Sequence, residues 1–136
     1  DPRVVLFERT NIRHFQGVGV EEPVDIATID TSFISLRHVV PPTLRFVREG
    51  GIILALVKPQ FEVGKGEVGK KGVVRDPALH LRVMGELAAF FAELGLTVKG
   101  TCESPITGPE GNKEFFIFAV KKEGSQEVRK IGRADK

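Results

Sequence analysis

The sequence predicts an α/β fold built on a mostly parallel sheet. Two near-continuous apolar runs, at residues 25–30 and 51–58, are typical of strands that are covered on both faces, as in a parallel sheet. A helical pattern follows each run, and strands that alternate with helices indicate α/β architecture with right-handed crossovers. Two more strands close the chain. The hairpin that they form predicts one antiparallel strand at the edge of the sheet.

The first half of the chain predicts three strands and one helix. The strands are the short apolar runs Val4–Phe7, Asp25–Asp30 and Gly51–Lys58. The helix covers roughly residues 36–48. Its adjacent prolines, Pro41 and Pro42, are expected to kink or split it, because proline removes a backbone donor and clashes with the preceding turn.

The second half begins with the clearest helix of the chain. Asp76 is a favourable N-cap, Pro77 suits the first helical position, and Gly95 ends the helix. The strands Thr97–Glu103 and Glu114–Lys121 follow, and the connection between them is rich in turn-forming glycine and proline. The predicted order is therefore β-β-α-β-α-β-β.

Composition indicates a single domain and excludes several classes of protein. The 136 residues are 41% apolar, and the net charge of +2 is too small to imply nucleic-acid binding by itself. The single cysteine, Cys102, excludes an internal disulfide and fits a reducing compartment. The longest apolar run, at residues 51–57, is far shorter than the ~20 residues of a membrane span. We therefore expect a cytoplasmic protein without membrane contact.

The domain is expected to cover residues 1–122, with a polar tail over 123–136. Arg129, Lys130 and Arg133 in this tail can contact solvent or RNA. The three histidines are scattered and have no second ligand at zinc spacing, so we expect no metal site. The sequence does not indicate an oligomeric state.

Polar residues end two of the predicted strands. Asp30 ends one and Lys58 ends the next, and ligands in open α/β sheets bind beyond the carboxyl ends of the strands. The alternative is that Asp30 only caps a turn and that Lys58 reaches solvent. Pro59 favours the first interpretation, because it biases Lys58 towards an extended conformation that a surface lysine does not need. Glu114, at the start of the last strand, is the third candidate.

The loop from residue 62 to residue 76 combines glycines with cations. Lys65, Lys70, Lys71 and Arg75 lie among four glycines, and such cations suit phosphate oxygens. The loop is also longer than most connections and shows no clear secondary structure. We expect it to contact phosphate, and the alternative is a solvated, flexible crossover.

Aromatic residues flank the three candidates. Phe33, Phe61, Phe115 and Phe116 could stack a splayed base, as aromatic side chains do with single-stranded RNA. For at least two of them, packing in the core is the more ordinary role.

Several segments together resemble one known family. They are residues 8–13, 30–36 (Asp-Thr-Ser-Phe-Ile-Ser-Leu), 58–66 (Lys-Pro-Gln-Phe-Glu-Val-Gly-Lys-Gly), 72–76 and 104–114. Their order and spacing, from about Val4 to Val120, resemble the TlyA (hemolysin A) family of FtsJ-like ribose methyltransferases, which carry an N-terminal S4 RNA-binding domain. The resemblance implies the C-terminal part of a Rossmann-like, class I methyltransferase sheet.

The resemblance also implies a reaction. FtsJ-like enzymes use a Lys-Asp-Lys-Glu constellation to move a methyl group from S-adenosylmethionine to a ribose 2′-hydroxyl, and Asp30, Lys58 and Glu114 match its last three members. The lysine could accept the hydroxyl proton, or its cation could stabilise the developing alkoxide, while the carboxylates orient the lysine and the hydroxyl. The implied partners are ribosomal RNA, at cytidines, or ribosomal subunits.

The chain departs from the family at its start. The first lysine, the glycine-rich cofactor loop, the acidic residue for the cofactor ribose and the S4 domain would all precede Asp1, and two family strands would lie between the Val4 and Asp25 strands. We therefore expect a fragment that is inactive alone. Glu8, Thr10 and Asn11 remain as candidates for cofactor contact. One alternative function is a non-catalytic RNA-binding module. The other is a membrane-active hemolysin, although no segment is long or amphipathic enough to form a pore.

Overall fold

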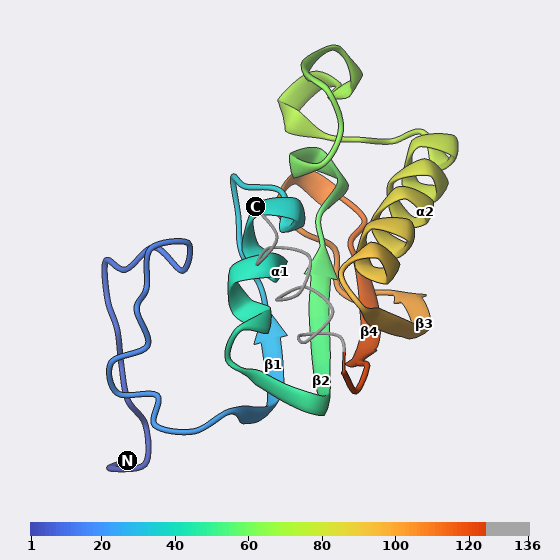
Figure 1. Ribbon diagram of the computed structural model, residues 1–136. Coiled ribbons are helices and arrows are strands. Elements are labelled where there is room, and N and C mark those ends of the chain that lie inside the picture. The colour runs from blue at the N-terminus through green and yellow to red at the C-terminus, as the bar shows by residue number, and fades with distance from the viewer. Residues whose placement is uncertain (125–136) are drawn as a thin grey trace, which may run out of the picture.

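The computed structural model describes residues 1–124 and shows a four-stranded sheet with two α-helices packed on one face (Figure 1). The elements are β1 (Val24–Ile29), α1 (Leu36–Leu44), β2 (Val47–Val57), α2 (Pro77–Glu93), β3 (Leu96–Glu103) and β4 (Phe115–Lys121). The α/β class is thus confirmed. Most of the predicted tail, including Arg129, Lys130 and Arg133, lies outside the described residues.

The strand order in the sheet is β1-β2-β4-β3. β1 pairs with β2 in parallel, and β4 is antiparallel to both β2 and β3, so three of the four strands point the same way. The mostly parallel sheet is confirmed, but the placement of the antiparallel strand at the edge is wrong. β4 occupies the interior because it is the more apolar of the last two strands: Ile117 and Ala119 are fully buried, whereas most of β3 is exposed.

The core lies between one face of the sheet and the two helices. Burial along β2 alternates with the two-residue period of a strand, and Ile53, Ala55 and Val57 face the helices. The opposite face carries exposed apolar side chains such as Ile26 and Phe118. Within residues 1–124 the strands are therefore covered on one face, which corrects the expectation of two covered faces.

Helix α1 is shorter than predicted and is not split. It runs through Pro41 and Pro42 and ends at Leu44, because the chain enters β2 at Val47. Its end is fixed by a buried lysine that the sequence did not indicate. Lys121 Nζ donates to the carbonyl of Leu44 at 3.0 Å and to that of Val47 at 2.8 Å, which satisfies a carbonyl that the helix leaves unpaired.

Helix α2 begins as predicted. The Asp76 side chain accepts a hydrogen bond from the amide of Ala78 at 2.9 Å, and Pro77 occupies the first helical position. The cap fixes the amino terminus of α2, and with it the end of the loop that precedes the helix.

The segment before β1 contains no strand, so the predicted strand Val4–Phe7 is wrong. Leu6 is 72% exposed, and no strand among residues 1–124 pairs with this run; an apolar run without a ladder partner gains nothing from an extended conformation. The segment packs through Phe15, whose ring lies 4.7 Å from Phe7 and 5.4 Å from Phe46. It thus lies beside β1 and α1 (Figure 1).

The long loop after β2 is more ordered than predicted. Three short 3₁₀ turns, Pro59–Phe61, Lys65–Glu67 and Lys70–Gly72, follow one another before α2. In Figure 1 the loop extends beyond the carboxyl end of β2. It therefore stands over the edge of the sheet where the candidate residues lie.

Candidate active site

The carboxyl ends of β1 and β2 bring Asp30 and Lys58 together. Lys58 Nζ lies 2.6 Å from Asp30 Oδ1 and donates a hydrogen bond to Ser32 Oγ at 2.9 Å. The Lys58 side chain is only 13% exposed, whereas that of Asp30 is 70% exposed. The two side chains are in contact, as neighbouring strands would bring them, and the alternative in which Lys58 extends into solvent is wrong.

Glu114 directly precedes β4, at the same end of the sheet as this pair. Val57 pairs with Phe115 across the sheet, so continuing this register by one residue sets Glu114 opposite Lys58. Glu114 is buried, and Gln60 Nε2 donates to its Oε2 at 3.4 Å. Gly108 runs so close to the carboxylate that a Cβ there would overlap it. Glu114 is thus an enclosed carboxylate rather than a solvated residue at the edge of a strand.

Asn112 ties the loop before β4 to the loop before α2. Its buried side chain accepts from the amide of Val74 at 3.0 Å and donates to the carbonyls of Gly72 at 2.9 Å and Pro109 at 3.2 Å. Sequence reasoning missed this residue, since an asparagine among turn formers is ordinary in any loop. These bonds fix the backbone two residues before Glu114.

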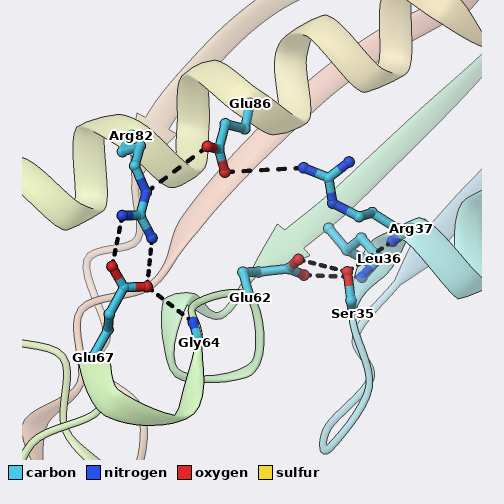
Figure 2. Close-up of polar contacts among 8 residues, drawn as sticks. All are labelled: Ser35, Leu36, Arg37, Glu62, Gly64, Glu67, Arg82 and Glu86. Atoms are coloured by element: carbon cyan, nitrogen blue, oxygen red, sulfur yellow. Dashed lines mark hydrogen bonds and ion pairs between the residues drawn. The ribbon is translucent and has the colours of Figure 1, made fainter.

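Glu62 is a second residue that sequence reasoning missed. The Ser35 hydroxyl donates to its Oε1 at 2.6 Å, and the amide of Leu36 donates to its Oε2 at 2.9 Å (Figure 2). Burial raises the pKa of the Glu62 carboxyl, although both hydrogen bonds and the nearby Arg37 oppose that shift. The only sequence signal was its position, four residues after Lys58.

The cationic loop is anchored to α2. Glu67 accepts two hydrogen bonds from Arg82, both of 2.6 Å, and one from the amide of Gly64 (Figure 2). These bonds, with the Arg82 hydrogen bonds as the largest cause, lower the pKa of Glu67 to about 2. The glycine-rich composition had suggested a flexible crossover, but Glu67 gives the loop a fixed attachment.

The four predicted phosphate-binding cations, unlike Arg82, are not paired with a carboxylate among residues 1–124. Lys65, Lys70, Lys71 and Arg75 are all exposed, and none forms a salt bridge within residues 1–124. Their charges are therefore available to a partner.

A pocket of about 290 Å³ opens among the loops that follow β1 and β2 and the loop that precedes β4. Phe33, Gln60, Phe61 and Lys71 contribute to its lining, together with Asn112. The rings of Phe33 and Phe61 lie 4.9 Å apart, and Phe33 is 88% exposed at a φ of 62°. An exposed aromatic ring in the left-handed region is uncommon, and such residues cluster at functional sites.

The candidates for cofactor contact lie elsewhere. Thr10 Oγ1 donates to the carbonyl of Glu8, and Asn11 Oδ1 accepts from the amide of Arg13, so their described bonds are local. Their segment is held by Arg45, which follows α1 near the amino end of β2. The structure thus does not bring Glu8, Thr10 and Asn11 to the Asp30–Lys58 pair, and their role stays a prediction.

The site defines an α/β protein whose charged residues gather beyond the carboxyl ends of adjacent parallel strands, the usual place for ligands in such sheets. The FtsJ-like methyltransferase family model matches residues 1–121, and the chain belongs to this family. The family that the sequence segments resembled is confirmed.

Individual relatives agree with this assignment. The chain is 47% identical over 118 residues to the Bacillus subtilis protein YqxC, covering 86% of this chain and 42% of that protein. It is 46% identical to the Mycobacterium tuberculosis protein named 16S/23S rRNA (cytidine-2′-O)-methyltransferase TlyA, covering 87% of this chain and 44% of that one. The chain thus spans less than half of the length of these relatives.

A solved structure gives the same picture. A Streptococcus thermophilus protein described as a hemolysin superposes with a TM-score of 0.85 at 37% identity, covering 94% of this chain and 50% of that one. Among residues 1–124, no helix is both long and apolar enough to cross a membrane, and no cluster of acidic, histidine or cysteine side chains could hold a metal ion.

The segment with the predicted cofactor-contact residues forms only a small pocket. The pocket at Thr10, shared with Phe7, Ile12 and Phe15, has a volume of only about 180 Å³. Small-molecule sites usually occupy ~300–1,000 Å³ and place several polar groups around the ligand. These residues by themselves therefore do not fit a whole S-adenosylmethionine molecule.

Proposed function

We propose that the protein methylates a ribose 2′-hydroxyl of ribosomal RNA, with S-adenosylmethionine as the co-substrate that supplies the methyl group. The observation that carries this proposal is the Asp30–Lys58 ion pair of 2.6 Å at the carboxyl ends of two parallel strands, with buried Glu114 across the sheet from it. The name of the Mycobacterium tuberculosis relative supports cytidines of 16S and 23S rRNA as the substrate.

The three residues suit the chemistry of the hydroxyl. A ribose hydroxyl is a weak nucleophile at neutral pH. As its oxygen bonds to the methyl carbon, the bond from that carbon to the sulfonium sulfur breaks, S-adenosylhomocysteine leaves, and the hydroxyl proton passes to a carboxylate of the site or to solvent. The ammonium group of Lys58 can stabilise the negative charge that develops on this oxygen. Asp30 holds the ammonium, and Glu114 can accept a hydrogen bond from the hydroxyl and so align it for in-line attack.

The loop and the aromatic pair suit the RNA. The exposed Lys65, Lys70, Lys71 and Arg75 can contact phosphates on either side of the target nucleotide. The pocket between Phe33 and Lys71 can take a base that has left its stack, as bases do where chemistry must reach a nucleotide.

The test is methyl transfer from labelled S-adenosylmethionine to rRNA or ribosomal subunits by the protein in its full natural length. Methylation of the 2′-oxygen protects the adjacent phosphodiester from alkaline hydrolysis, so an alkali-resistant labelled dinucleotide separates ribose from base methylation. We expect Lys58→Ala and Glu114→Ala to lower kcat by at least about 100-fold, as loss of a charge-stabilising group does. Unchanged transfer in both variants would exclude the catalytic role of Lys58 and Glu114, whereas a wild-type protein that binds rRNA without methyl transfer would favour a non-catalytic RNA-binding module.

A membrane-active function has only the names of relatives in its favour, such as the description of the Streptococcus thermophilus neighbour as a hemolysin. Co-sedimentation with liposomes and release of an entrapped dye measure this activity directly. Dye release at a rate that Lys58→Ala does not change would support a membrane function that is separate from methyl transfer.

A further inference from the structure

Two short segments carry the candidate pair, and they are tied together at both ends. Residues 30–35 leave β1 and residues 58–62 leave β2. At one end Lys58 contacts Asp30 and Ser32, and at the other Glu62 receives hydrogen bonds from Ser35 and Leu36. The second tie, seen in Figure 2, has no part in the reaction as proposed.

The second tie resembles a capping box whose carboxylate comes from elsewhere in the chain. In a capping box the glutamate lies three residues after the N-cap, but that position of α1 is His38. Glu62, 27 residues after Ser35, accepts instead from the Ser35 hydroxyl and from the amide of Leu36, the first helical residue, while Ser35 Oγ accepts from the amide of Arg37. The start of α1 is thereby fixed to the segment that carries Lys58.

Packing supports the Asp30 segment in its second half, where Ile34 lies against the core and the Phe33 ring contacts Phe61. Asp30 and Ser32 are exposed, and Phe33 is an exposed residue with a φ of 62°. The position of the Asp30 carboxylate therefore depends on where the two ends of the segment are held. Strand β1 holds one end, and the hydrogen bonds to Glu62 hold the other.

The environment of Glu62 suits a role beyond capping. Ser35 already supplies the capping hydroxyl, so the helix does not need a second acceptor in order to begin. Burial nevertheless raises the pKa of the Glu62 carboxyl, against the lowering effects of Ser35, Leu36, Arg37 and His38. A half-buried carboxylate that belongs to one segment and accepts hydrogen bonds at the end of the other is better explained by the need to join them.

We infer that Glu62 is a positioning residue for the methyl transfer: it fixes the Ser35 end of the Asp30 segment to the Lys58 segment and so sets the geometry of the Asp30–Lys58 pair. The inference rests on the proposed function. Glu62 itself does not touch the reacting atoms, and it acts through the distance and direction between the two catalytic side chains.

The test compares three variants of the protein in its full natural length. Glu62→Ala removes both hydrogen-bond acceptors. Glu62→Gln keeps the geometry, because its amide oxygen can accept from Leu36 and its amide nitrogen can donate to Ser35. Glu86→Ala is the matched control, since Glu86 also lies near Arg37, at 3.9 Å, but is exposed and does not join the two segments.

At a temperature at which the variant is folded, we expect Glu62→Ala to lower kcat about 10- to 100-fold. Small misplacements of catalytic groups have effects of this size. The KM for RNA and for S-adenosylmethionine should change by less than about threefold, since binding contacts remain. Glu62→Gln should recover most of the loss, and Glu86→Ala should match the wild type. A purely structural role would lower the melting temperature and leave kcat unchanged.

Hydrogen exchange supplies a readout that needs no activity. Peptides covering residues 30–36 should exchange faster in Glu62→Ala than in the wild type or Glu86→Ala, whereas α2 should not change. A folded Glu62→Ala protein with wild-type kcat, or with unchanged exchange over residues 30–36, would overturn the inference. If Glu62→Ala does not fold, Ser35→Ala removes one hydrogen bond to Glu62 and is judged by the same two measurements. If the wild-type protein shows no methyl transfer, the proposed function is refuted. Hydrogen exchange over residues 30–36 then decides by itself whether Glu62 joins the two segments.

Discussion

Replacing Asn112 with alanine should destabilise the protein by about 3 kcal/mol. The side chain makes three hydrogen bonds, to Val74, Gly72 and Pro109. Each contributes roughly 0.5–1.5 kcal/mol, and the buried amide of Val74 would lose its acceptor, which costs about 1–3 kcal/mol if water does not replace it. Gly72 and Pro109 are exposed residues, so water can replace the bonds to their carbonyls and the total lies nearer about 3 kcal/mol than the sum of the upper limits.

The assay is urea denaturation followed by circular dichroism, with a thermal scan as a second measurement. For a chain of this size, a loss of about 3 kcal/mol lowers the melting temperature by roughly 10 °C. The neighbouring Lys113→Ala is the control, because Lys113 is exposed and its ion pair with Glu103, at 3.9 Å, should contribute less than about 1 kcal/mol. Methyl transfer should also fall in Asn112→Ala, since Asn112 fixes the loop that leads into Glu114.

A small effect would refute this reasoning. If the free energy of unfolding of Asn112→Ala lies within about 0.5 kcal/mol of the wild type, as for an ordinary surface substitution, the three hydrogen bonds do not hold the two loops together. An equal loss in Lys113→Ala would instead point to a general sensitivity of this loop.

Two further predictions concern the loop that precedes α2. The pKa of Glu67 is about 2 in the folded protein, against an ordinary value of 4.5. Its ion pair with Arg82 therefore stabilises the protein above pH 4.5, and this contribution is lost as the pH falls towards 2. Urea midpoints between pH 6 and pH 2 should therefore fall more steeply in the wild type than in Glu67→Gln, and parallel curves would contradict the ion pair. Replacing Lys70 and Lys71 together with glutamine should weaken binding to an rRNA fragment and reduce the slope of log affinity against log salt by about 0.7–0.9 for each phosphate that the protein no longer neutralises. Anisotropy titrations at several salt concentrations measure this slope, and an unchanged slope would place the RNA elsewhere.

The sequence predicted those parts of the fold that depend on local signals. The start of α2 followed from Asp76 and Pro77, whose capping chemistry lies within three residues. The runs that became β1 and β2 were recognisable from apolar content alone, and the charged residues at their ends followed from the rule for parallel sheets. The pairing of Asp30 with Lys58 could therefore be expected from the order of residues alone.

Other parts could not be predicted because they depend on partners distant in the chain. The apolar run at residues 4–7 reads as a strand, but no neighbouring strand among the described residues pairs with it. The place of β4 between β2 and β3 depends on a competition between two strands for the interior of the sheet. Neither outcome is encoded within a window of a few residues.

The sequence by itself determined most of the helices and strands after residue 23, the family and the candidate residues Asp30, Lys58 and Glu114, because each is carried by a short pattern of residues. Only the tertiary structure decided how these residues are held. Glu62 reaches Ser35 across 27 positions and Asn112 reaches Val74 across 38, and hydrogen bonds between such distant positions leave no periodic trace in a sequence. Their existence depends on the packing of two loops beyond the same edge of the sheet, which is a property of the folded chain.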